Sequence, residues 1–223
     1  MTSLTKIVLA GEGGQGVQSI ADVLAQAGND EGKAALYIPN FGIEQRGGVS
    51  LAYVQIAEES IGSPKFETGD LVIALSERAV ARTRQYVGDE TVFVYDSSLI
   101  VPPQIDDQAI GMQVYDTVAP QLQAKEESAK EKEFATALLP GNARRVIGIP
   151  AGTIARKELH PRVFNMIVLG AAVAITGVVQ METIYAALEK KLGAKFEKNP
   201  KLRDLNHSAL TRGQELAMQE GVK

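Results

Sequence analysis

The stretch "GEGGQGV", residues 11 to 17, has the first composition along the chain that could serve chemistry. Gly11, Gly13 and Gly16 fit the pattern G-x-G-x-x-G, between an apolar run and an amphipathic run. Backbone N–H groups at a helix N-terminus attract phosphate oxygens where no side chain intervenes, and the helix dipole adds to the attraction. The turn therefore predicts binding of an anionic group, with phosphate as the first candidate. The alternative is that the glycines only allow close packing of strand and helix.

A second glycine-rich turn follows in "FGIEQRGGVS", residues 41 to 50. Arg46 carries a guanidinium suited to bidentate contact with a phosphate or carboxylate, and Gly47 and Gly48 stand directly before a strand. Glu44 and Arg46 could equally fix the loop or contact a neighbouring subunit. Both turns are expected at the carboxyl ends of the first two strands, the edge where α/β sheets bind ligands. We expect them to share one site.

Two familiar nucleotide sites are tested by the same region. A dinucleotide fold needs an acidic residue at the end of its second strand, but residues 37 to 41 read "YIPNF" and Glu44 comes only later. A P-loop is excluded because no Gly-Lys-Ser/Thr follows the first turn. An NADP-type oxidoreductase in which Arg46 meets the 2′-phosphate is kept as an alternative.

Composition limits the chemistry that this chain can carry. Its 223 residues are 45% hydrophobic with a formal net charge of −4 and no basic cluster, which argues against a nucleic-acid partner. Cysteine is absent, so the chain can build neither a thiolate nucleophile nor a conventional iron–sulfur cluster. The two histidines, His160 and His207, lie far apart; His160 precedes Pro161 and is expected to start a helix. We expect no catalytic and no metal-binding residue on this chain.

One segment calls for a membrane test. The run "VFNMIVLGAAVAITGVV", residues 163 to 179, is shorter than the roughly 20 residues that span a bilayer, and it contains Asn165. It is predicted to be a helix covered on most sides, by the core or by another subunit. The N-terminus lacks a signal-peptide pattern, so no membrane partner and a cytoplasmic location are expected.

Strand and helix patterns alternate along the chain and predict the fold class. Helical spacing runs over 17–27 and 76–87, and nearly all of the chain from residue 161 onward is predicted helical. We expect an α/β fold: a three-layer, mostly parallel Rossmann-like sheet with helices on both faces and a helical C-terminal third, in one domain, 1–223. The short connection before 49–56 favours an antiparallel strand there, and residues 117–145 are predicted to be a charged helical insertion. The predicted strands are 6–10, 35–39, 49–56, 71–75, 92–95 and 146–149.

Together the two turns resemble those of the gamma subunits of 2-oxoacid:ferredoxin oxidoreductases, the family of pyruvate, 2-oxoglutarate, 2-oxoisovalerate and indolepyruvate enzymes. The likeness continues through "GDLVIALSE" (69–77), "YDSSL" (95–99), "VIGIPAGTIA" (146–155) and "NMIVLGAAVAITG" (165–177). Residues 117–145 fall outside it, because the family is usually shorter there.

The resemblance implies a multi-subunit enzyme. Such a complex converts a 2-oxoacid and coenzyme A to an acyl-CoA and carbon dioxide, and passes electrons through iron–sulfur clusters to ferredoxin. Thiamine diphosphate, magnesium and the clusters are implied on alpha and beta subunits, with a delta subunit as a further candidate partner. The chain would then be a hetero-oligomer member without activity of its own, with a dimer expected when it is isolated. The sequence does not give the 2-oxoacid or the stoichiometry.

The resemblance also suggests a ligand for the glycine turns, because coenzyme A carries a diphosphate and a 3′-phosphate. The first turn is predicted to contact a CoA phosphate, and the second to line the same entrance. A pure scaffold without ligand is the alternative. The predicted residues are Gly11, Gly13, Gly14, Gln15, Gly16, Arg46, Gly47 and Gly48.

Overall fold

The structure, a computed structural model, describes residues 4–41, 48–98 and 139–219 of the chain. Its centre is a six-stranded sheet in the order β2-β3-β1-β4-β5-β6. Most of the predicted charged insertion lies outside the described residues, and the described part, 139–144, is irregular chain leading into β6. The strands are β1 (Leu4–Glu12), β2 (Ala34–Asn40), β3 (Val49–Ala57), β4 (Leu71–Ala74), β5 (Val92–Asp96) and β6 (Arg145–Ile149).

Strand β3 gives the sheet its mixed character. It pairs antiparallel with β1 on one side and with β2 on the other, whereas β1, β4, β5 and β6 pair in parallel. The predicted antiparallel direction is confirmed, because the connection from Asn40 to Val49 is too short for a crossover helix. One consequence is that β2 lies two strand spacings from β1, about 10 Å away.

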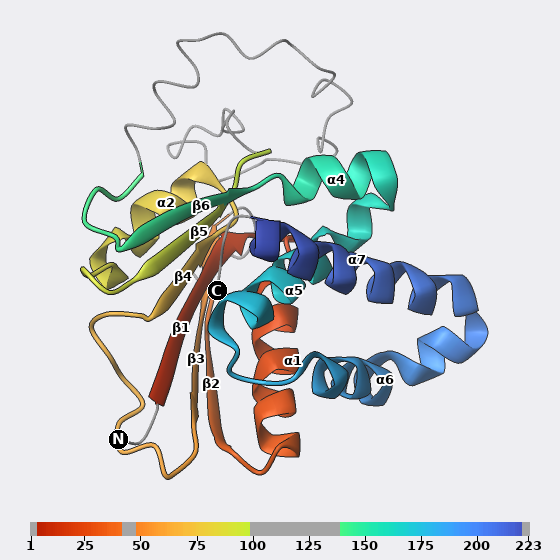
Figure 1. Cartoon of the computed structure of the whole chain (residues 1–223), viewed down its shortest axis with the longest axis horizontal. Coiled ribbons are helices and arrows are strands. Elements are labelled where there is room, and N and C mark those ends of the chain that lie inside the picture. The colour runs from red at the N-terminus through yellow and green to blue at the C-terminus, as the bar shows by residue number, and fades with distance from the viewer. Residues whose placement is uncertain (1–3, 42–47, 99–138, 220–223) are drawn as a thin grey trace, which may run out of the picture.

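Helices cover the two faces of the sheet unequally. Helices α1, α5, α6 and α7 lie on one side and α2 on the other (Figure 1). Along β1, Ile7 and Leu9 face the larger core with α1 and α5, while Val8 and Ala10 face the smaller core beside α2. The expected α/β class is confirmed. The helices are α1 (Val17–Asp30), α2 (Glu77–Thr83), α4 (Ala151–Glu158), α5 (Phe164–Thr176), α6 (Met181–Lys198) and α7 (Pro200–Gln219), with 3-10 turns η1 (Arg84–Tyr86) and η2 (Pro161–Val163).

The helices on the larger face are stacked two deep. Helix α6 packs against α1, and α7 packs along α5 rather than on the sheet. The backbones of α5 and α7 touch at Gly170 and Gly213: a Cβ atom on Gly170 would overlap the carbonyl of Leu210, and one on Gly213 would overlap that of Ile167. The prediction of an apolar helix covered on most sides is therefore confirmed within this chain. No helix in the described part of the chain is both long and apolar enough to cross a membrane.

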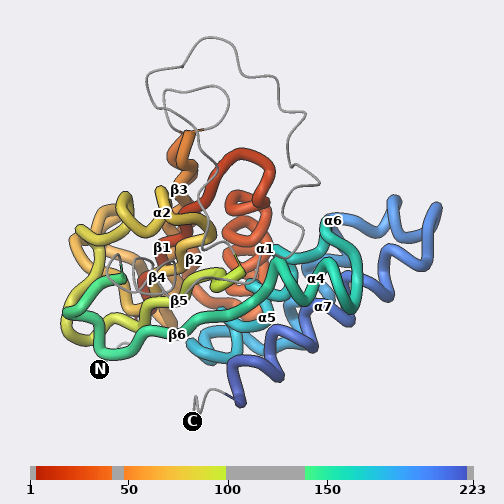
Figure 2. The backbone as a smooth tube through the Cα atoms, turned by 90° about the horizontal axis from the view of Figure 1, so that it is seen from above, coloured from red at the N-terminus to blue at the C-terminus, as the bar shows by residue number. Residues whose placement is uncertain are grey.

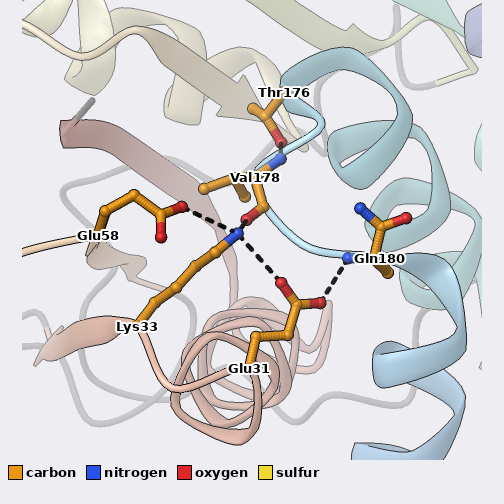
Figure 3. Close-up of polar contacts among 6 residues, drawn as sticks. All are labelled: Glu31, Lys33, Glu58, Thr176, Val178 and Gln180. Atoms are coloured by element: carbon orange, nitrogen blue, oxygen red, sulfur yellow. Dashed lines mark hydrogen bonds and ion pairs between the residues drawn. The ribbon is translucent and has the colours of Figure 1, made fainter. Parts of the chain in front are cut away.

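A cluster of charged residues lies at the opposite edge of the sheet from the glycine turns, where α1 ends and β2 begins (Figure 3). Lys33 Nζ donates to the Val178 carbonyl oxygen at 2.7 Å and pairs with carboxylates of Glu31 at 3.1 Å and Glu58 at 3.4 Å. Glu31 also accepts a hydrogen bond from the Gln180 N–H at 2.6 Å, directly before α6. The cluster joins the turn after α1 to the chain between α5 and α6.

Candidate functional site

The candidate site lies at the edge of the sheet where β1, β2, β4, β5 and β6 end and β3 begins. Figure 2 views the molecule from this side, with the start of α1 above the sheet. Glu12, the last residue of β1, is the register partner of Val49, the first residue of β3. The first glycine turn and the described end of the second turn, Gly48, therefore lie side by side, as the sequence predicts.

The edge also holds the topological switch point of the sheet. The chain leaves β1 through α1 on one face and leaves β4 through α2 on the other. Open α/β sheets bind ligands where neighbouring strands send their helices to opposite faces. The first glycine turn spans this position.

Gly11 and Gln15 form the closed side of the turn. Gln15 Oε1 accepts a hydrogen bond from the Glu12 N–H at 2.6 Å, and Gln15 Nε2 donates to the Leu75 carbonyl at 2.8 Å. A Cβ atom on Gly11 would lie only 2.7 Å from Gln15 Oε1, so Gly11 is needed for packing. The Gln15 amide thus links the end of β1 to the residue after β4. The predicted contact of Gln15 with a ligand stays a prediction, and it would use the second N–H of the side-chain amide.

Gly13 and Gly14 form the open side of the turn. Both are exposed, and a Cβ atom on Gly14 would meet nothing within 4 Å. Gly14 has a φ of 92°, and Gly16, which caps α1, has a φ of 77°; both angles lie in the left-handed region that side chains disfavour. Backbone near Gly13 and Gly14 is therefore free for a ligand or a partner to approach.

Gly16 also meets helix α5. A Cβ atom on Gly16 would lie 2.6 Å from Asn165 Nδ2, so the starts of α1 and α5 are in contact. Asn165, which the sequence marks as unusual inside an apolar helix, lies at this contact. Arg162, three residues earlier in the chain, is exposed.

Three helices begin separately at this edge, and they differ in how their N-terminal N–H groups are satisfied. A fourth helix, α5, continues directly from η2, whose start is capped by His160. Helix α2 is capped by Ser76, whose Oγ accepts the Ala79 N–H at 3.2 Å. Helix α4 is capped from a distance by Asp96 and Ser98 at the end of β5. Helix α1 has no side-chain cap and no acidic residue in its first turn. Among the helices that begin separately at this edge in the described residues, α1 is the one whose N-terminus has no side-chain cap and stays available to an anion.

Sequence reasoning missed the cap on α4. The Asp96 carboxylate accepts hydrogen bonds from the N–H groups of Ser98 at 2.9 Å and Gly152 at 3.2 Å, and Ser98 Oγ accepts the Thr153 N–H at 2.8 Å. Burial raises the pKa of the Asp96 carboxyl, although these donors act in the opposite direction. Asp96 in the stretch "YDSSL" and Gly152 in "VIGIPAGTIA" lie more than 50 residues apart in the chain, and no local sequence signal indicates that they are in contact.

Glu12 introduces a negative charge beside the turn. Its Oε1 is buried and has no hydrogen-bond partner among the residues that the structure describes. A buried acceptor without a donor is costly, so the turn offers a place for a donor group as well as for an anion.

Two predicted site residues, Arg46 and Gly47, lie outside the residues that the structure describes. Gly48 is described and is partly buried immediately before β3. The predictions for Arg46 and Gly47 therefore stay predictions.

The two histidines take structural positions. His160 Nδ1 accepts the Arg162 N–H at 3.2 Å at the start of η2, so the predicted helix-start role is confirmed. His207 of α7 packs against Tyr185 of α6, with ring centroids 4.7 Å apart. Within the described ranges, no three His, Asp or Glu side chains come together as a metal-ligand set.

Comparison with known proteins extends over nearly the whole chain. Residues 6–216 match the family described as pyruvate ferredoxin/flavodoxin oxidoreductase. The ketoisovalerate oxidoreductase subunit VorA of Methanothermobacter thermautotrophicus is 31% identical over 95% of this chain. The chain spans only 36% of that relative's length.

Solved structures share the fold. The gamma subunit of a keto/oxoacid ferredoxin oxidoreductase from Geobacter sulfurreducens aligns with a TM-score of 0.68 at 24% identity, covering 96% of this chain and 99% of that one. The 2-oxoglutarate:ferredoxin oxidoreductase of Magnetococcus marinus, solved with 2-oxoglutarate, coenzyme A and succinyl-CoA bound, aligns with a TM-score of 0.73 at 22% identity. That alignment covers 99% of this chain and 32% of the other. The resemblance to gamma subunits is confirmed, and the chain belongs to the pyruvate ferredoxin/flavodoxin oxidoreductase family.

Proposed function

We propose that this chain is the non-catalytic gamma subunit of a 2-oxoacid:ferredoxin oxidoreductase complex. The names of its relatives support this assignment. The sequence contains no cysteine to ligate an iron–sulfur cluster, so the clusters, thiamine diphosphate and magnesium would be carried by alpha and beta subunits, with a delta subunit as a further candidate. Because relatives act on different 2-oxoacids, the substrate choice is assigned to those subunits.

We further propose that the start of α1 binds a phosphate of coenzyme A. The observation that carries this proposal is the uncapped N-terminus of α1, since the other two helices that begin separately at this edge have side-chain caps. The exposed backbone of Gly13 and Gly14 lets an anion come close, and Arg46, Gly47 and Gly48 would line the same entrance. The presence of coenzyme A in the Magnetococcus structure agrees with this ligand.

In this role the chain orients a substrate of its partners. Backbone N–H groups of the first turn of α1 would donate hydrogen bonds to phosphate oxygens, and the helix dipole would add to the attraction. Holding the phosphate end of the cofactor fixes the direction in which its thiol extends toward the reaction centre. No bond is made or broken by this subunit.

A scaffold role without ligand is the second candidate, and Glu12 favours it. Its unpaired buried carboxylate oxygen repels a phosphate placed beside it but would accept a hydrogen bond from a neighbouring subunit. In that case the exposed turn would be a docking surface.

The variant Gly13→Val separates the two candidates. Gly13 is exposed and lacks the left-handed backbone of Gly14 and Gly16, so the valine fills the approach without backbone strain. Gly62→Val is the matched control, because Gly62 is also exposed and a Cβ atom there meets nothing within 4 Å. Both variants are assembled with their partner subunits.

For CoA binding, Gly13→Val is expected to raise the KM for CoA about tenfold, the effect of losing about 1.4 kcal/mol, while the complex still assembles. Calorimetry with CoA on the assembled complex should show the same loss of affinity. Unchanged CoA binding together with weakened assembly would establish the scaffold role instead. If neither CoA binding nor assembly of the complex changes, the first glycine turn has neither of the two proposed roles.

A further inference from the structure

A hydrogen-bond network centred on Gln18 lies between the first turn of α1 and the strands β2 and β3. Gln18 Nε2 donates both of its hydrogens, one to Ser50 Oγ at 2.5 Å and one to the Leu51 carbonyl at 2.9 Å. Gln18 Oε1 accepts the Tyr37 hydroxyl hydrogen at 2.6 Å. The Leu51 carbonyl fixes the orientation of the amide, because the reversed amide would place its oxygen against this carbonyl oxygen.

The network joins the flanks of both turns. Gln18 lies in the first turn of α1, two residues after its cap Gly16. Tyr37 lies in the middle of β2, and Ser50 and Leu51 lie at the start of β3. The Gln18 side chain therefore joins α1 to β2 and β3, three of the four elements that flank the two turns.

Backbone pairing and apolar packing also hold α1, β2 and β3 together. The strands are registered by their own backbone pairs, and α1 is anchored by buried apolar residues such as Ile20 and Leu24. Losing the Gln18 amide would leave this packing in place. It would free the first turn of α1 to shift relative to β2 and the start of β3, because no other side-chain hydrogen bond within the described residues joins α1 to these strands.

We propose that Gln18 is a positioning residue that sets the place of the first turn of α1 against β2 and the start of β3. The proposal rests on the CoA-binding function proposed above, and it explains how the uncapped start of α1 is held in a preorganised position for an anion. Gln18 itself stays beneath the site, partly buried, with its amide fully engaged. Tyr37 acts through Gln18: burial raises the pKa of its phenol, which keeps the hydroxyl protonated as a donor.

The test compares two glutamines of the same helix. Gln18→Leu removes the network, whereas Gln26→Leu removes only a hydrogen bond from Gln26 to exposed Asp30 near the other end of α1. In the assembled complex, Gln18→Leu is expected to raise the KM for CoA about fivefold, with kcat at saturating CoA unchanged. Gln26→Leu is expected to change neither constant.

A second readout does not depend on CoA. The chain has no cysteine, so spin labels can be placed cleanly at two exposed positions, Ser19→Cys in α1 and Asn40→Cys at the end of β2. Dipolar broadening in electron paramagnetic resonance should report one narrow distance distribution in the parent and in Gln26→Leu. Gln18→Leu should widen that distribution. Adding Tyr37→Phe to Gln18→Leu should widen it no further.

The outcomes separate this proposal from the function beneath it. A wider distribution together with a raised KM supports the positioning role. An unchanged distribution overturns it, and so does an unchanged KM in Gln18→Leu when Gly13→Val raises the KM. If Gly13→Val and Gln18→Leu both leave CoA kinetics unchanged, the proposed CoA site itself fails and the positioning role falls with it.

Discussion

The carboxylate of Asp96 accepts the N–H of Gly152 at 3.2 Å, so the end of β5 caps a helix that begins more than 50 residues later. Gly152 permits this approach, since a Cβ atom there would lie 3.1 Å from Asp96 Oδ2. The contact fills the N-terminus of α4 with a charge from the chain itself. It is the reason that α1, and not α4, is assigned the anion.

Replacing Asp96 tests this cap and its pH dependence. Burial raises the pKa of Asp96 in the folded state, so the parent has its full stability from this group below the unfolded pKa and loses it as the pH rises through the raised value. Asp96→Asn keeps an acceptor but does not titrate. Its free energy of unfolding, relative to the parent, should therefore improve between pH 3 and pH 7. Urea unfolding at both values measures this.

The control for that prediction is Asp96→Ala, which removes the cap altogether. At pH 7 it should be less stable than Asp96→Asn by about 1 kcal/mol, the usual worth of an N-cap side chain. Equal stability of the two variants would show that the hydrogen bonds to Ser98 and Gly152 contribute nothing.

The contact between α5 and α7 predicts an opposite response at two helical glycines. Gly170→Ala places a methyl group against the Leu210 carbonyl and should lower stability by about 2 to 3 kcal/mol, despite the better helix propensity of alanine. Gly193→Ala in α6 meets open space and should raise stability by up to about 1 kcal/mol. Thermal unfolding followed by circular dichroism distinguishes the two. A stabilised Gly170→Ala would refute the close packing.

The contact between Gly16 and Asn165 predicts non-additive substitutions. Gly16→Ala should cost about 1 to 2 kcal/mol, because alanine disfavours the left-handed backbone and its methyl group meets the Asn165 amide. Asn165→Ala opens space at that point, so the double variant should be more stable than the sum of the single losses predicts. A strictly additive double-mutant cycle would mean that the two residues do not interact.

The ion cluster of Lys33 predicts acid sensitivity of another kind. Burial alone would raise the pKa of Glu31, but hydrogen bonds, first from Gln180 and then from Thr183 and Lys33, outweigh it and lower the pKa. Its stabilisation is present above the unfolded pKa and is lost as the pH falls through the lowered value. Glu31→Gln should thus cost about 1 kcal/mol at pH 7 and much less at pH 3. A cost that does not change with pH would rule out the charge.

Local patterns were sufficient for most of the framework. Runs such as 6–10 and 71–75 are apolar throughout, which is typical of strands buried on both faces, and the short link before 49–56 fixed the direction of β3. Helix α4 was not predicted, because "AGTIARKE" lacks a local start signal and takes its cap from Asp96 and Ser98. The order of the strands was not predicted, because no local pattern reveals that β3 inserts between β1 and β2.

The position of the candidate site could be predicted from the sequence, but the roles of its individual residues could not. The glycines and their position before α1 follow from the sequence alone. The side chain of Gln15 could have faced a ligand or the core, and the deciding partner is a carbonyl at Leu75, 60 residues away. The role of Gln18 could not be predicted, because it depends on contacts with Tyr37 of β2 and Ser50 of β3.

The insertion of β3 between β1 and β2 constrains the order in which the strands of the sheet can pair during folding. Strand β1 precedes both of its neighbours in the chain, residues 49–57 and 71–74, so its pairing can be completed only after both have been synthesised. The β2–β3 hairpin, by contrast, can close as soon as Ala57 emerges, because its pairing is local. We expect the β2–β3 hairpin to form first during synthesis and β1 to join the sheet after it.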